Sequence, residues 1–115
     1  MSPSTPACEV TVTIMYKRTP DLQLDTEYLI QTHIPAVAKA WTPHGLLGAI
    51  VSQPAADSEY AMMTVVRFQT MKGWLKASSD AEQMGLLMAD VANFSNQTPE
   101  FVVGTVVQGG IFEVS

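Results

Sequence analysis

The stretch Glu9-Val-Thr-Val-Thr-Ile-Met-Tyr-Lys17 alternates between two kinds of residue along its whole length. In a β-strand successive side chains point to opposite sides, so this alternation predicts a strand with two different faces. The apolar face holds Val10, Val12, Ile14 and Tyr16. The opposite face holds Thr11, Thr13 and Met15. Such semi-polar side chains suit the wall of a cavity better than open water.

Residues 26–41 have the spacing of an amphipathic helix that lies across a sheet. Apolar residues recur three and four positions apart, at Ile30, Ile34, Val37, Ala38 and Trp41. Asp25 stands where an N-cap is expected, directly before the first helical residues. Pro35 has no N–H to donate and its ring crowds the carbonyl four residues back, so we expect a kink or broken turn after His33.

Four further segments continue the alternation of strands and helices. Residues 46–52, 60–68 and 101–107 are rich in apolar residues and bounded by turn residues, which predicts three strands. The first and last of these are apolar on both sides, which indicates that both faces are covered. Residues 70–91 have helical spacing that breaks near Ser78-Ser-Asp80, where Asp80 is expected to cap the second half.

The order strand, helix, strand, strand, helix, strand predicts an α+β domain with a ferredoxin-like four-stranded antiparallel sheet and both helices on one face. The other face of the sheet is then left bare by the chain itself. The composition is 47% hydrophobic and only 15% charged, below the roughly 25% charge of an average soluble domain. We therefore expect apolar surface to be hidden by a second copy of the chain or in a cavity for an apolar ligand.

The length of 115 residues suits one domain. We expect a flexible N-terminal tail at residues 1–8, the α+β domain at 9–108 and a C-terminal extension at 109–115. The first residues lack the basic segment and the apolar run of a signal peptide. Cys8 is the single cysteine and cannot form an internal disulfide, which favours a reducing compartment and a cytoplasmic location.

The net charge of −5 argues against nucleic acid as a partner, because neutralising phosphates supplies most of that affinity. Anionic membrane surfaces are disfavoured for the same reason, and no apolar run approaches the ~20 residues that span a bilayer. The spacing of Cys8, His33 and His44 matches no structural zinc site, and no metal is expected. The glycine-containing segments lack the strand-to-helix context of a phosphate loop, so nucleotides are not expected.

Several short strings, in their order and spacing, resemble the EthD family of dimeric α+β-barrel proteins. The histidine-x-proline pair that follows a tyrosine is the most specific of them. They are Tyr16-Lys-Arg followed by Pro20; Tyr28 five residues before His33; Thr32-His-Ile-Pro-Ala36; Trp41-Thr-Pro-His-Gly-Leu46; Asn93-Phe94; and residues 99–107. The resemblance spans roughly residues 10–107.

The resemblance implies a homodimer in which two four-stranded sheets form a barrel, with a pocket between the sheet and the helices of each protomer. The wider superfamily includes polyketide cyclases, decarboxylases, isomerases and monooxygenases that need no cofactor. It also includes accessory proteins of hydrocarbon and ether degradation. Because one fold hosts many functions, the resemblance alone does not choose among them.

His33 is the first candidate for a catalytic base or acid, because an imidazole titrates near neutral pH. It is also the histidine of the family's motif. The alternative is a structural histidine that bonds the carbonyl freed by Pro35. His44 is a second catalytic candidate at the mouth of a pocket, or else part of an exposed turn. The family often has an aromatic residue at the position of His44, so the histidine is either a tolerated replacement or a specialisation.

Tyr16 is the third catalytic candidate, because its hydroxyl could stabilise a phenolate or enolate oxygen, and Tyr28 could do the same while contacting the substrate. Both could instead be packing residues. Asp25 could orient His33 or simply cap its helix. The further candidates for substrate contact are Trp41, Met15, Met63, Phe68 and Asn93. For the methionines and Trp41, packing in the core is the alternative.

The leading functional hypothesis is a cofactor-independent enzyme that acts on an aromatic or polyketide-like small molecule. Proton transfer would lead to cyclisation, decarboxylation, dehydration or isomerisation. One alternative is a non-catalytic protein that binds a hydrophobic metabolite or supports a partner oxygenase. Another is a monooxygenase without a cofactor, which would consume oxygen.

Overall fold

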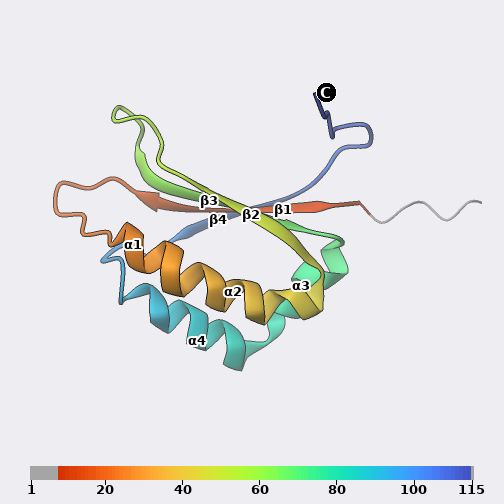
Figure 1. Cartoon of the computed structure of the whole chain (residues 1–115), viewed down its shortest axis with the longest axis horizontal. Helices are drawn as coiled ribbons and strands as arrows, with labels where there is room; N and C mark the ends of the chain where they lie inside the picture. The colour runs from red at the N-terminus through yellow and green to blue at the C-terminus, as the bar shows by residue number, and fades with distance from the viewer. Residues whose placement is uncertain (1–7, 115) are drawn as a thin grey trace, which may run out of the picture.

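The computed structural model describes residues 8–114, so residues 1–7 of the expected tail and Ser115 lie outside the described residues. A four-stranded antiparallel sheet has all of its helices on one side (Figure 1). The strands are β1 (Val10–Lys17), β2 (Leu46–Ser52), β3 (Tyr60–Phe68) and β4 (Glu100–Thr105). Their order in the sheet is β2-β3-β1-β4.

The first helical region is continuous but changes its winding along its length. It consists of α1 (Thr26–Tyr28), the π-helical turn η1 (Leu29–His33) and α2 (Ile34–Trp41). Asp25 caps it, because its side chain accepts a hydrogen bond from the backbone N–H of Tyr28. The irregular turn predicted from Pro35 is present, but it precedes the proline instead of following His33. A proline cannot donate a backbone hydrogen bond, and the wider turn accommodates that loss upstream.

The second helical region is divided where the sequence predicts the break. Helix α3 (Met71–Ser79) is followed directly by α4 (Ala81–Val91). The side chain of Asp80 accepts from the backbone N–H of Gln83 and caps α4, as expected. Thr70 caps α3 in the same way, through the N–H of Gly73. The short 3₁₀ turn η2 (Thr42–His44) packs against α3 so closely that a methyl group on Gly73 would overlap the carbonyl oxygen of His44.

The core lies between the sheet and the helices. Val10, Val12 and Tyr16 of β1 point to this side and are buried, as the alternation predicts. One cluster is built around Trp41, Phe68 and Trp74, whose ring centroids lie 5.5 Å apart in each pair. A second cluster contains Leu29, Met62 and Phe94. This second cluster surrounds the end of the helix layer that holds the candidate site.

No helix among residues 8–114 lies on the opposite face of the sheet (Figure 1). A row of mainly apolar side chains crosses this face from edge to edge, because the strand registers align Ile50, Val65, Thr13 and Val102. At the edges of the row, Ile50 is 68% exposed and Val102 is 57% exposed. The sequence predicts cover on both faces of these edge strands, and the part of the chain that the structure describes covers only one.

Candidate functional site

His33 lies at the end of the π-helical turn, with its side chain directed toward α4. The residue is only 7% exposed, and its ring centroid lies 4.6 Å from that of Phe94. Its Nδ1 atom is 2.8 Å from Oδ2 of Asp90, near the end of α4. The turn in front of Pro35 and the end of α4 therefore meet at this pair of side chains.

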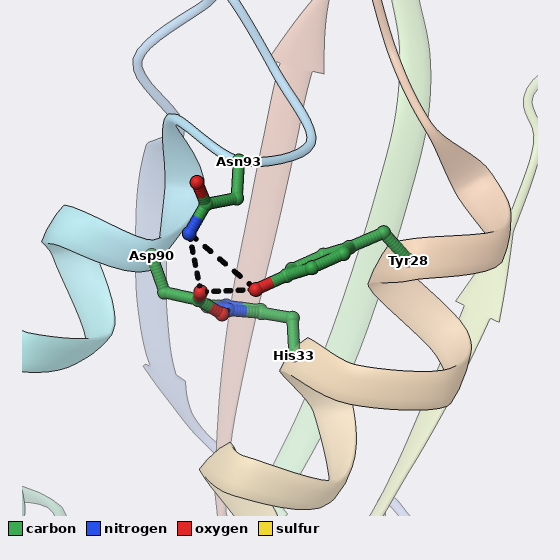
Figure 2. Close-up of polar contacts among 4 residues, drawn as sticks. All are labelled: Tyr28, His33, Asp90 and Asn93. Carbon is green, nitrogen blue, oxygen red and sulfur yellow. Dashed lines mark hydrogen bonds and ion pairs between the residues drawn. The ribbon is translucent and has the colours of Figure 1, made fainter.

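Asp90 is the centre of a network of four polar side chains (Figure 2). Its Oδ1 atom accepts hydrogen bonds from the Tyr28 hydroxyl at 2.6 Å and from the Asn93 amide nitrogen at 2.9 Å. Its Oδ2 atom faces His33. Asn93 also reaches the Tyr28 oxygen at 3.4 Å. With both carboxylate oxygens engaged, Asp90 is held in one orientation.

The network keeps Asp90 ionised. Desolvation by burial works to raise the pKa of the Asp90 carboxyl, but the hydrogen bonds from Tyr28, Asn93 and His33 outweigh it, and the pKa falls below its ordinary value. The hydrogen bond to Asp90, together with burial, raises the pKa of the Tyr28 phenol, so Tyr28 stays protonated and donates. A carboxylate can only accept hydrogen bonds, so Nδ1 of His33 carries a proton. In the neutral ring the other nitrogen, Nε2, then has a free lone pair.

The rest of the His33 ring faces apolar space between the sheet and the helices. His33 lines two small cavities, one toward β2 and one toward α4 and β4, and each also contains Ile14, Tyr16 and Val37 in its wall. Each has a volume of about 30 Å³, room for no more than a few water molecules. Burial raises the pKa of Tyr16 to about 12, so its hydroxyl is a neutral donor at physiological pH.

The structure brings five of the sequence candidates together and places the others elsewhere. His33, Tyr28 and Asn93 share the Asp90 network, and Tyr16 shares the cavities with His33. Trp41 lines the cavity toward α4, and its buried indole N–H has no acceptor among residues 8–114. The structural alternative for His33 is a hydrogen bond from its ring to the backbone carbonyl that Pro35 leaves free. Nδ1 does not make that bond, because it faces Asp90.

The remaining candidates lie apart from this cluster. His44 lies in η2, in a surface groove with Gln69 and Lys72. Met15 and Met63 are opposite each other in the β1–β3 pairing, on the face of the sheet that has no helices. Phe68 packs against Trp41 in the core. The side chain of Asp25 caps α1, and it is Asp90 that contacts His33.

Asp90 is the residue that sequence reasoning missed. Its partners Tyr28 and His33 lie 62 and 57 positions away, so no local pattern connects them. The only local signal is Asn93, three residues later, which places both side chains on one side of a helix end. Among the described residues, no group of three or more His, Cys, Asp or Glu side chains is arranged to hold a metal ion. No helix in the described part of the chain is long and apolar enough to cross a membrane.

No protein-family model matches the chain, and no curated protein matches its sequence. Solved structures do match its fold. An EthD-like protein from Ralstonia eutropha superposes with a TM-score of 0.73 at 21% identity, over 88% of this chain and 94% of its own. SnoaB, a cofactor-independent oxygenase from Streptomyces nogalater, gives 0.59 at 13% identity, over 89% and 96%. A dimeric ferredoxin-like protein of unknown function from Thermobifida fusca gives 0.55 at 15% identity, over 86% and 92%.

The sheet order, the antiparallel pairing and these superpositions define the class: a ferredoxin-like α+β fold. Within that class, the chain has the fold of the EthD proteins, as the sequence resemblance implies.

Proposed function

We propose that this protein is a cofactor-independent enzyme that moves a proton on a small aromatic or polyketide-like substrate, with His33 as the base. The contact between Nδ1 of His33 and Oδ2 of Asp90, at 2.8 Å, carries the proposal. A buried histidine oriented by a carboxylate is the arrangement by which proteins fix one tautomer and leave the other nitrogen free to accept a proton.

The roles of five polar residues follow from their positions. Nε2 of His33 removes a proton from an acidic C–H or O–H of the substrate, and Asp90 stabilises the imidazolium that forms. The neutral hydroxyl of Tyr16 donates to the oxygen on which negative charge develops. Tyr28 and Asn93 touch Asp90 and act as positioning residues. Apolar walls strengthen these interactions because they keep water away.

The protein acts as a homodimer of the EthD family, with residues 9–108 as the domain. The helix-free face supports this, since a row of exposed apolar side chains of this kind is an unfavourable surface in water. The dimeric ferredoxin-like neighbour gives independent support. Two sheets packed face to face would bury Ile50 and Val102.

A cofactor-free oxygenase is the second candidate, and the similarity to the fold of SnoaB favours it. In that reaction the same base would deprotonate a ring CH₂ group. Dioxygen would then convert this CH₂ to a carbonyl, with release of one water molecule. The two candidates share His33 and differ in the consumption of oxygen.

The test uses 2-tetralone, a bicyclic ketone whose ring-adjacent CH₂ is acidic. Wild-type protein in D₂O should exchange these protons faster than buffer does, as followed by NMR, and His33→Gln should lose roughly 10²–10⁴-fold of that catalysis. His44→Gln is the matched control and should exchange at the wild-type rate. Equal exchange by wild type and His33→Gln would contradict the proposal. Consumption of oxygen during the same reaction, measured in parallel, would instead support the function of a cofactor-free oxygenase.

A further inference from the structure

The space around His33 is too small for the substrates that it would act on. Each cavity beside the ring has a volume of about 30 Å³, whereas ligand sites for small organic molecules usually reach roughly 300–1,000 Å³. A substrate can therefore reach His33 only if side chains in the cavity wall move. The position of the movable wall decides which part of the molecule forms the rest of the binding site.

An open groove lies on the other side of one of these walls. It runs along the end of α4 and the segment that connects α4 to β4, and it has a volume of about 310 Å³. Met88, Val91 and Pro99 line both this groove and the His33 cavity toward α4. These three residues are thus the partition between an apolar cavity that holds the base and a groove that is open to solvent.

Met88 is the side chain in this partition that can move at low cost. Val91 and Pro99 are buried, and both have restricted side chains, since valine is branched at Cβ and proline is a ring. Met88 is only partly buried, and its unbranched chain has three rotatable bonds. A change of its rotamer needs no movement of the backbone.

The groove differs in character from the cavity. Its outer rim is the run Asn96-Gln-Thr98, and its lining contains no charged residue. The side chain of Asn96 bonds the backbone of Gln23 and Asp21, and that of Gln97 bonds Thr19, so the rim is fixed to the loop before α1. A fixed, uncharged polar rim next to an apolar cavity suits a molecule with one apolar and one neutral polar end.

We propose that this groove is the outer half of the substrate site and that Met88 is the gate between the two halves. This inference rests on the proposed function of His33 and adds the substrate class. The substrate is an elongated molecule whose end with the acidic C–H passes Met88 to reach His33, while a hydroxyl or another neutral polar group at the opposite end stays at the rim near Thr98. A carboxylate or phosphate at that end would give up part of its hydration and find no counter-charge in the groove lining.

The position of the gate can be measured without any substrate. Diethyl pyrocarbonate acylates unprotonated histidine nitrogens, and the chain has only two histidines. Peptide mass spectrometry should show that Met88→Ala speeds the acylation of His33 severalfold and that Met88→Phe slows it, with His44 unchanged as the internal control. A variant that had merely lost its fold would expose His33 in both cases, and urea unfolding of each variant checks this.

Leu46→Ala is the matched control, because Leu46 lines the other cavity of His33, toward β2. It should leave the acylation rate of His33 at the wild-type value. The gate is overturned if Leu46→Ala speeds this reaction while Met88→Ala does not. Acylation of His33 does not depend on turnover. A failure of the Met88 gate can therefore be told apart from a failure of the proposed function, which would show as unchanged proton exchange in His33→Gln.

The substrate class is tested with 2-tetralone, its 6-hydroxy derivative and its 6-carboxy derivative, compared by KM in the proton-exchange assay. The hydroxy compound should have the lowest KM and the carboxy compound the highest. Thr98→Val should raise the KM of the hydroxy compound and leave that of 2-tetralone unchanged. A carboxy compound that binds best would overturn the assignment of a neutral polar end.

Discussion

Nδ1 of His33 lies 2.8 Å from Oδ2 of Asp90, a contact that ties the π-helical turn before α2 to the end of α4. The other oxygen of Asp90 is occupied by Tyr28 and Asn93, so the carboxylate cannot rotate away without losing two hydrogen bonds. The contact thus fixes both the orientation of the imidazole and the nitrogen that carries its proton.

Asp90→Asn should change the tautomer of His33. An amide can present its NH₂ group to Nδ1, which would place the imidazole proton on Nε2 and remove the free lone pair from the cavity side. The ¹⁵N chemical shifts of the His33 ring report the tautomer directly, and proton exchange of 2-tetralone should fall in parallel. Asn93→Ala is the control, because it leaves the carboxylate in place and should keep the wild-type tautomer. An unchanged tautomer in Asp90→Asn would show that Asp90 does not position His33.

Acid should destabilise the native protein in part through Asp90. The pKa of this carboxyl is lower in the folded protein than its ordinary value of 3.8, so the folded state binds the proton less readily than the unfolded chain. Its contribution to stability is present above about pH 4 and is lost as the pH falls from there through its native pKa. The free energy of unfolding, measured by urea titration between pH 5 and pH 2, should therefore fall less steeply in Asp90→Asn. Identical slopes in the two proteins would contradict this assignment.

The parts of the fold that depend on local pattern were predictable from the sequence. The alternation of residues 9–17 gave the correct buried face of β1, and Asp25 and Asp80 cap the helices that follow them. Capping needs only a side chain and the amides of the next turn, so the signal is contained within four residues. The order of the strands and helices likewise followed from the sequence alone, because the spacing of apolar residues within each segment predicts whether it is a strand or a helix.

The arrangement of the site depends on contacts that no local pattern contains. Asp90 meets His33 only after α4 has packed beside α2, so a sequence reading that considers each helix alone misses it. His44 illustrates the opposite case, since it is chemically suitable and lies at the far end of α2 from His33. The chemistry of a residue could be predicted, whereas its neighbours required the tertiary structure.

Gly73→Ala should destabilise the protein, and Gly85→Ala should not. An added methyl at Gly73 overlaps the carbonyl oxygen of His44, which is backbone and cannot easily move, and such overpacking costs about 1–3 kcal/mol. At Gly85, within α4, an added methyl meets nothing nearby, and alanine favours the helix by about 1 kcal/mol. Urea unfolding of both variants measures the difference. A Gly73→Ala protein as stable as wild type would mean that η2 and α3 separate at little cost.

The last prediction concerns the helix-free face of the sheet and compares two equally exposed side chains. Ile50 on that face and Leu86 on α4 are both 68% exposed, so a glutamate at either site has the same access to solvent in a single chain. If a second copy covers the sheet, Ile50→Glu buries a charge in an apolar interface and should shift the protein to monomers, with Val102→Glu doing the same. Leu86→Glu should leave the dimer intact, because α4 lies on the other side of the molecule. Sedimentation velocity at micromolar concentration measures all four proteins, and a wild-type monomer or a dimeric Ile50→Glu would contradict the pairing of the two sheets.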